Sequence, residues 1–219
     1  ADATTTTTTT TKTTAAAAAA PRATGKRKAE APPCDAPLYL RRLTKELARI
    51  FKERDEMRTQ LQMEIEPLSE DKIDVWRVKW FYDHAKEADA TETQRRLKEQ
   101  LDARELEFIE FRLVFPEDYA WSPPFVYNHY PRLHGNYIFS CGGICAETLS
   151  KEFGWSPANT PQALVLAVRS LLENAGCRLI SGDCPDPTEQ PNDADAARKD
   201  AESIARMHAS GWHGSRGSS

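Results

Sequence analysis

The stretch Glu107–Tyr130, EFIEFRLVFPEDYAWSPPFVYNHY, holds the pattern that decides the fold. Between Ile109 and Phe115, large apolar residues alternate with other residues, which is typical of a strand with one face in the core. Pro116 ends this strand because proline has no N–H to donate to a neighbouring strand. A second, proline-bounded strand is predicted around residues 125–127, so the stretch predicts two consecutive strands joined by a proline-rich turn.

Two segments earlier in the chain show the same alternation. TQLQMEIEPL and DVWRVKWFY each predict a strand with one buried face. The residues expected to face the core are Leu61, Met63, Ile65, Trp76, Val78 and Trp80. The highly charged residues 84–106 separate these strands from the third and predict an exposed, inserted helix. Consecutive strands pair most often with their neighbours, so we expect a four-stranded antiparallel meander.

Helical periodicity is confined to the two ends of the domain. Residues 38–58 carry one apolar stripe, and a second buried helix is predicted within 159–176, with Thr160 or Asn159 as its cap and Gly176 as its end. A third, Ala-rich helix is expected at 192–212. Helices at the ends of an antiparallel meander indicate an α+β fold, with an N-terminal helix and C-terminal helices around the sheet.

Composition limits the class of protein. Of 219 residues, 40% are hydrophobic and 28% are charged, as in a soluble globular protein. The net charge of −4 argues against general nucleic-acid binding, and no stretch is long and apolar enough to suggest a membrane partner. Residues 1–37, rich in Thr, Ala and Pro, are predicted to be disordered. The expected catalytic or binding domain therefore spans residues 38–215.

The segment HGNYIFSCGGICAETLSKEFGWSP, residues 134–157, carries the candidate chemistry. The chain has five cysteines, an odd number, and no secretory signal, so a reducing compartment, cytoplasm or nucleus, is expected. Three interpretations of its thiols stay open. Cys141 and Cys145 could bind zinc with Cys177 and Cys184, although neither pair is a tight C-x-x-C. Cys145 could instead be a protease nucleophile with a histidine base, or a thiol that carries an acyl group.

Acyl transfer through a thioester needs the least machinery of the three. The thioester is already activated, so the site requires an accessible thiol and a hydrogen-bond donor for the oxyanion that forms when an amine attacks. Asn136, nine residues before Cys145, is a suitable neutral donor. Glu147, two residues after it, is a candidate to interact with the incoming lysine.

Taken together, FRLVFPEDYAWSPPFV, HGN, GGIC and GWSPANTPQALVLAVRSLL resemble the core of ubiquitin-conjugating enzymes over about residues 38–180. The resemblance implies that family's fold, with Cys145 as thioester acceptor and neither cofactor nor metal. Gly135 stands where the family's His-Pro-Asn motif has proline, and Cys145 lies one residue further from the motif than is typical. These departures, the insertion at 84–106 and the C-terminal ARKDAESIARMHASGW are similar to the Q-type branch.

The resemblance also implies partners: ubiquitin or a related modifier, an activating enzyme and ubiquitin ligases. In the family the first helix binds the activating enzyme, and its expected contacts here are Arg41, Arg42, Lys45 and Arg49. The proline-rich turn corresponds to a ligase-binding region, with Trp121, Pro123 and Pro124 as candidates; packing of Trp121 within the turn is the alternative. A non-catalytic, ubiquitin-binding adaptor of the same fold is the rival function.

Overall fold

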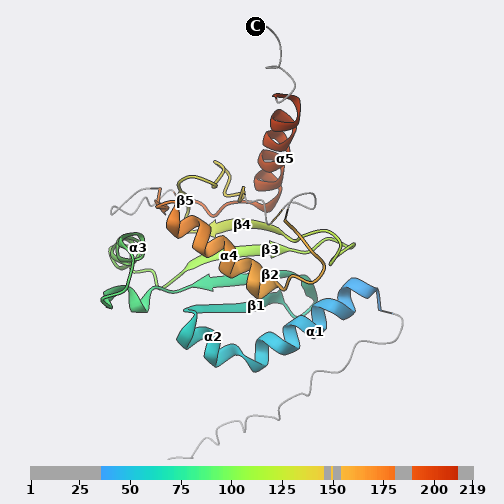
Figure 1. Ribbon diagram of the computed structural model, residues 1–219, viewed down its shortest axis with the longest axis horizontal. Helices are drawn as coiled ribbons and strands as arrows, with labels where there is room; N and C mark the ends of the chain where they lie inside the picture. Colours follow the sequence, from blue (N-terminus) through green and yellow to red (C-terminus); the bar gives the residue numbers. More distant parts are fainter. Residues whose placement is uncertain (1–35, 146–148, 150–153, 181–188, 212–219) are drawn as a thin grey trace, which may run out of the picture. The chain divides into compact units, whose positions relative to one another are not determined.

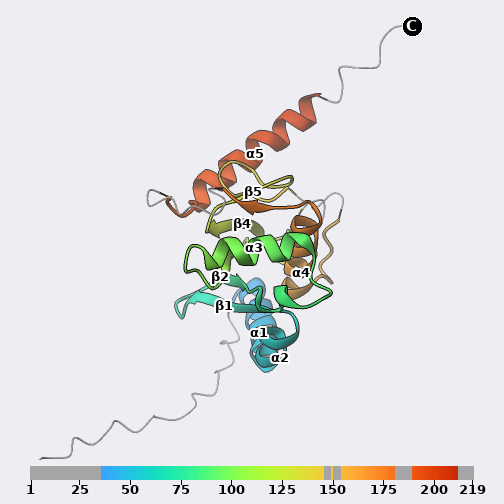
Figure 2. The same cartoon turned by 90° about the vertical axis from the view of Figure 1, so that its left-hand side faces the viewer.

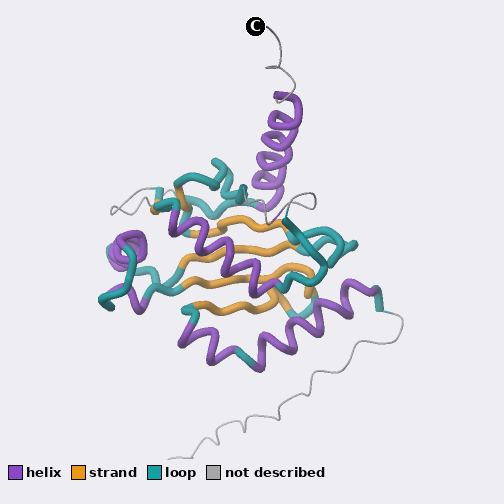
Figure 3. The backbone as a smooth tube through the Cα atoms, in the orientation of Figure 1, coloured by secondary structure: helices purple, strands orange, loops and turns teal. Residues whose placement is uncertain are grey.

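An antiparallel sheet of four strands organises the chain. The computed structural model describes residues 36–145, 149, 154–180 and 189–211. Within them, β1 (Met63–Ser69), β2 (Lys72–Trp80), β3 (Ile109–Val114) and β4 (Phe125–Tyr130) lie in the order β1-β2-β3-β4, each antiparallel to the next (Figures 1 and 3). The predicted meander and the α+β class are confirmed. The tail predicted to be disordered lies outside the described residues up to residue 35.

Strand register places the large apolar residues on one face of the sheet. Val78 pairs with Phe111 and Trp80 with Ile109, and all four are at most 1% exposed. The rings of Trp80 and Phe111 lie 4.0 Å apart, centroid to centroid. Because side chains alternate across a strand, a shift of one residue would turn this whole set towards solvent. The hydrophobic pattern therefore sets the register.

Helix α4 (Pro161–Asn174) crosses the sheet in Figure 1 and buries its apolar stripe. Its ends follow the predicted signals. The Thr160 hydroxyl accepts a hydrogen bond from the Ala163 N–H at 3.2 Å, and Pro161 occupies the first turn. Gly176 follows the helix with a φ of +71°, a left-handed conformation that favours glycine. Both predicted caps are confirmed.

The helix expected over 38–58 is divided in two, α1 (Leu38–Lys52) and α2 (Arg54–Gln60). The break lies at Glu53, whose N–H is shared between the carbonyls of residues 49 and 50 at 3.2 Å each. The new direction lets α2 pack on β1 and bury Met57. Leu61, expected in the first strand, instead follows α2, so that strand begins two residues later.

The insertion forms a short 3₁₀ helix, η1 (Asp83–Lys86), and helix α3 (Glu92–Asp102). Helix α3 starts with a capping box in which Thr91 and Gln94 each bond the other's backbone N–H. The prediction of a fully exposed helix was wrong. Leu97 and Leu101, four residues apart, share one helical face and are buried.

The remaining elements lie near β4. A two-stranded sheet joins β5 (Leu133–His134) to β6 (Arg178–Leu179), and α5 (Ala194–Gly211) follows. Figures 1 and 2 both show α5 extending from the β4 side of the sheet. Among the helices of the described residues, none is long and apolar enough to cross a membrane.

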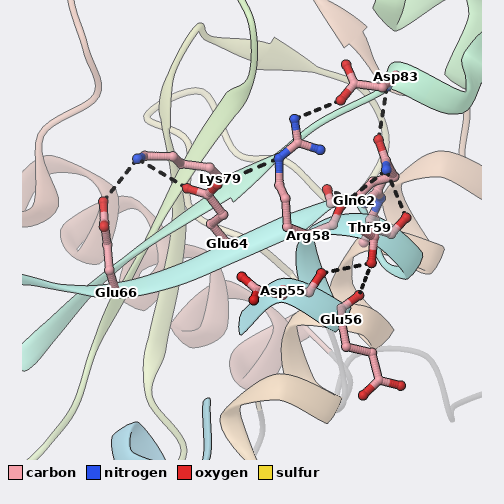
Figure 4. A network of polar contacts seen from close by, with 10 residues as sticks. Asp55, Glu56, Arg58, Thr59, Gln62, Glu64, Glu66, Lys79 and Asp83 are labelled. Atoms are coloured by element: carbon pink, nitrogen blue, oxygen red, sulfur yellow. Dashed lines mark hydrogen bonds and ion pairs between the residues drawn. The ribbon is translucent and has the colours of Figure 1, made fainter. Parts of the chain in front are cut away.

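A polar network joins α2 to the insertion (Figure 4). Arg58 binds Asp83 at 2.8 Å and Glu64 at 3.6 Å. Close by, one ring nitrogen of His84 lies 3.1 Å from the Thr59 carbonyl oxygen, and the other contacts the Glu87 carboxylate. Both partners only accept hydrogen bonds, so the geometry requires the doubly protonated imidazolium. The Thr59 carbonyl, and then Glu87, raise the pKa of His84.

This junction predicts a pH-dependent contribution to stability. A raised pKa in the folded state means that the contribution is complete below the unfolded pKa of about 6.5 and is lost as the pH rises through the folded value. Comparing the urea midpoints of the wild type and His84→Gln at several pH values should give a difference that shrinks as the pH rises from about 6 to about 9. A difference independent of pH would contradict the imidazolium assignment.

Candidate functional site

Residues 137–145 form a narrow antiparallel ladder, not the irregular loop expected from the sequence between Phe139 and Trp155. The Phe139 N–H donates to the Gly143 carbonyl and the Cys145 N–H donates to the Tyr137 carbonyl, each at 2.8 Å. A bridge between residues 138 and 144 lies between these bonds. The sequence lacks an alternating pattern here because the second arm holds two glycines. The ladder gives the backbone of Cys145 a defined place.

The second arm of the ladder is docked on β4. The Asn128 N–H donates to the Gly142 carbonyl at 2.8 Å, and the Ile144 N–H donates to the Val126 carbonyl at 3.3 Å. Asn128 is fully buried, and its side chain also bonds the Pro131 carbonyl at 3.0 Å and the Leu133 N–H at 2.8 Å. One buried amide thus joins the sheet, the ladder and the chain that leads to β5.

The three described cysteines differ in their surroundings. Cys141 and Cys145 are free and half-buried, whereas Cys177 is 1% exposed. Burial, and then Glu173, raise the pKa of Cys177 to about 12, so its thiol is neutral at pH 7 and is a poor metal ligand or nucleophile. Cys184 lies outside the described residues. Among the residues that are described, no group of three His, Cys, Asp or Glu side chains could hold a metal ion.

His134-Gly135-Asn136 leads directly into the ladder. His134 is exposed and pairs with Arg178 through β5 and β6. Gly135 has a φ of +154°, and a Cβ there would lie 3.1 Å from the Cys177 Cα. Proline, whose φ is held near −65°, does not fit this backbone. The glycine that departs from the His-Pro-Asn pattern is therefore required by the local packing.

Asn136 is exposed and precedes Tyr137, whose carbonyl bonds the Cys145 N–H. The ladder thereby brings the residue before Tyr137 alongside the end of the arm that carries Cys145. Within the described residues, the Asn136 side chain makes no hydrogen bond, which leaves its amide free to donate. Glu147, the other residue predicted from the sequence, lies outside the described residues.

Tyr137 was missed by the sequence reasoning. Its φ of +69° is rare for a residue with a side chain, and its ring is 49% exposed although it is aromatic. Strained backbone of this kind is concentrated at functional sites. No sequence signal marks it, because a tyrosine ordinarily indicates strand or core.

The basic face of α1 is narrower than predicted. Arg42 pairs with Glu46 at 2.8 Å and Arg49 with Glu53 at 3.2 Å. Arg41 and Lys45 are exposed and make no ion pair within the described residues. These two are the cations left for a partner.

The proline-rich turn presents one large apolar side chain. Trp121 is 72% exposed, whereas Pro124 is buried and Pro123 half-buried. The indole does not pack into the turn, which was the alternative to a binding role. Trp155, further on, is buried, and its indole N–H donates to the Ala120 carbonyl at 2.8 Å, so the turn is tied to the chain after the ladder.

These features define an α+β protein with an exposed asparagine and a half-buried, free thiol at one end of its sheet. Comparison with curated proteins supplies relatives for it. The chain is 42% identical over 59 residues, 27% of its length and 36% of the relative's, to the Q-like protein 1 of the ubiquitin-conjugating enzymes in mouse and human. It is 27% identical over 108 residues, 49% of its length and 24% of the relative's, to ubiquitin-conjugating enzyme E2 Q1 of the same species.

The predicted resemblance to ubiquitin-conjugating enzymes, and to their Q-type members, is confirmed by these matches. The matched regions span only about a quarter to a third of the length of the curated relatives. Among solved structures, human ubiquitin-conjugating enzyme E2 G1 is similar with a TM-score of 0.47 and 17% identity, over 63% of this chain and 96% of that one. No protein-family model matches the chain.

The close approach around Gly142 generates a stability prediction. Gly142 has a φ of +86°, and a Cβ there would lie 2.5 Å from the Asn128 carbonyl oxygen and also clash with the Asn192 amide. Gly176 offers a matched control, since its φ is also positive but no atom lies within 4 Å of its Cβ position. Gly176→Ala should cost about 1–2 kcal/mol of unfolding free energy, from the left-handed backbone alone.

Gly142→Ala should cost about 1–3 kcal/mol more than Gly176→Ala, because the added methyl group overpacks the ladder against β4. Urea denaturation of the two variants beside the wild type measures both values. Equal costs would mean that the ladder does not lie as close to residues 128 and 192 as described.

Proposed function

We propose that this chain is an active ubiquitin-conjugating enzyme. It accepts ubiquitin, or a related modifier, as a thioester on Cys145 and transfers it to a lysine, directly or with a ligase. The observation that carries the proposal is the free, half-buried thiol of Cys145 at the end of a hydrogen-bonded ladder, with an exposed asparagine alongside. The similarity to ubiquitin-conjugating enzymes supplies the chemistry that such a thiol serves.

The first step exchanges one thioester for another. The Cys145 thiolate attacks the carbonyl carbon of the modifier's C-terminal thioester on the activating enzyme. A new C–S bond forms to Cys145, the old C–S bond breaks, and the activating enzyme's cysteine leaves as a thiolate. The exchange is close to balanced in energy, so neither a metal nor a strong base is required.

The second step forms an amide. A lysine amine attacks the same carbonyl carbon, a tetrahedral oxyanion forms, and Cys145 leaves as a thiolate while the amine's proton passes to solvent or a nearby base. The Asn136 amide would donate a hydrogen bond to the oxyanion. Its side chain supports this role because it is exposed and makes no bond of its own within the described residues. Glu147 would attract the incoming lysine.

The surface supports two protein partners. Arg41 and Lys45, the unpaired cations of α1 among the described residues, would meet an acidic surface of the activating enzyme. The exposed Trp121 would anchor a ligase, since an aromatic side chain buries much surface at an interface. The chemistry requires a reduced thiol, which fits the cytoplasm or the nucleus.

A free thiol at this position favours the enzyme over the non-catalytic adaptor. An adaptor needs a binding surface for the modifier but no nucleophile, and nothing in that role would keep residue 145 a cysteine.

A charging assay tests the acceptor. Incubation with activating enzyme, ATP and ubiquitin should give an adduct that a reducing agent releases, and Cys145→Ser should convert it into a more stable oxyester. Cys141→Ser is the matched control, since Cys141 is also free and half-buried, and it should charge normally. A panel of related modifiers in the same assay identifies the cargo.

Loss of charging in Cys141→Ser, with normal charging in Cys145→Ser, would move the acceptor to residue 141. Absence of any adduct with every modifier in the panel would leave the adaptor as the better function.

Asn136→Ala separates the two chemical steps. If the amide stabilises the oxyanion, discharge to free lysine should slow by up to about 3 kcal/mol of activation free energy, while charging changes little. Single-turnover discharge measures the effect, with Asn174→Ala, an exposed asparagine at the end of α4, as the control. Discharge at the wild-type rate would reduce Asn136 to a loop residue.

A further inference from the structure

The peptide bond between Ser140 and Cys141, at the turn of the ladder, is held from both sides by opposite charges. The Arg132 guanidinium donates to the Ser140 carbonyl oxygen at 2.9 Å. One carboxylate oxygen of Asp200, on α5, accepts from the Ser140 hydroxyl at 2.9 Å and from the Cys141 N–H at 3.3 Å. Three hydrogen bonds, each with a charged partner, thus fix a single turn.

The signs of these charges select one orientation of the peptide plane. A cation faces the carbonyl oxygen and an anion faces the N–H, so both interactions are favourable as the chain stands. Turning the plane over would direct the carbonyl oxygen at Asp200 and the N–H at Arg132, which is unfavourable at both ends. The turn carries Gly142 and Gly143 directly after it, and glycine adopts alternative conformations readily. The charges therefore restrict a segment that is intrinsically permissive.

Both arms of this clamp, Arg132 and Asp200, are anchored elsewhere. The Arg132 N–H donates to Glu189 at 2.6 Å, and Glu189 pairs with Arg104 of the insertion at 3.0 Å, with both side chains at most 4% exposed. On the other side, the Asp193 carboxylate caps the first turn of α5. The clamp thus connects the ladder to the insertion and to the C-terminal helix.

Helix α5 also packs tightly against the ladder. A Cβ at Gly143 would lie 3.1 Å from the Ala197 carbonyl oxygen and 3.7 Å from the Ala201 Cβ, and Ala197 is fully buried. The side-chain amide of Asn192, just before the helix, donates to the Asn128 carbonyl at 2.9 Å. Asp200 therefore reaches the turn from a helix that is itself held in place.

We propose that Arg132 and Asp200 are positioning residues for transfer through Cys145, an inference that rests on the proposed function. By holding the turn, they hold the arm that ends at Cys145 while its thioester is attacked. A reacting atom misplaced by about 1 Å can slow a reaction by about a hundredfold, so this restraint bears on rate even though neither side chain touches the sulfur.

The experiment compares Asp200→Ala and Arg132→Met with Asp200→Asn and with Glu202→Ala. An asparagine oxygen can accept both bonds of Asp200, and Glu202 is an exposed acid on the same helix. Asp200→Ala and Arg132→Met should slow single-turnover discharge about tenfold. Asp200→Asn and Glu202→Ala should stay within about twofold of the wild type, because each leaves the turn's hydrogen bonds in place. Wild-type discharge in Asp200→Ala, or equal slowing in Glu202→Ala, would overturn the proposal.

A second readout does not depend on activity. Hydrogen exchange at the Cys141 and Cys145 amides should speed up at least about tenfold in Asp200→Ala, equivalent to about 1.4 kcal/mol of lost protection, and should be unchanged in Glu202→Ala. If the wild type forms no thioester, the proposed function fails, and this measurement still judges the clamp. Unchanged exchange in Asp200→Ala would refute it.

Discussion

The buried side chain of Asn128 is the contact on which the site depends. It is fully enclosed beneath the end of β4, where an unpaired amide would be costly, so its hydrogen bonds are obligatory. They join the strand to the chain before β5, while its backbone holds the ladder and the segment before α5. Three parts of the chain that are distant in sequence therefore meet at one residue, and the place of Cys145 follows from where they meet.

The sheet could be predicted from the sequence because its information is local. Alternation at Trp76, Val78 and Trp80 reports which face is buried, and the same holds for Ile109 to Phe115. Thr160 and Gly176 likewise mark the ends of α4 by their own chemistry. The break at Glu53 and the buried face of α3 could not be predicted with equal ease, since each depends on what the helix packs against.

The site was predictable only in part. A free thiol near an exposed asparagine could be found by spacing and by resemblance, because both residues lie in one short segment. The contacts that shape the segment come from far along the chain: Asn128 and Asp200 each reach it across a gap that no periodicity spans. Tyr137 is a different case, because its left-handed backbone contradicts the ordinary preference of its residue type and so leaves no trace in the pattern.

Gly142 and Gly143 set how closely α5 approaches the sheet. At both positions a methyl group would meet atoms of the segment around 192–201 within 3.1 Å, so backbone faces backbone with no side chain between them. Residue choice at 142 and 143 is consequently linked to residue choice at 197 and 201, where alanines keep the helix surface shallow. Sequence drift on either side of this contact is confined to paired changes, and a glycine pair matched by small residues some 55 positions later, the interval from 142 to 197, is a signature by which chains with the same arrangement can be recognised.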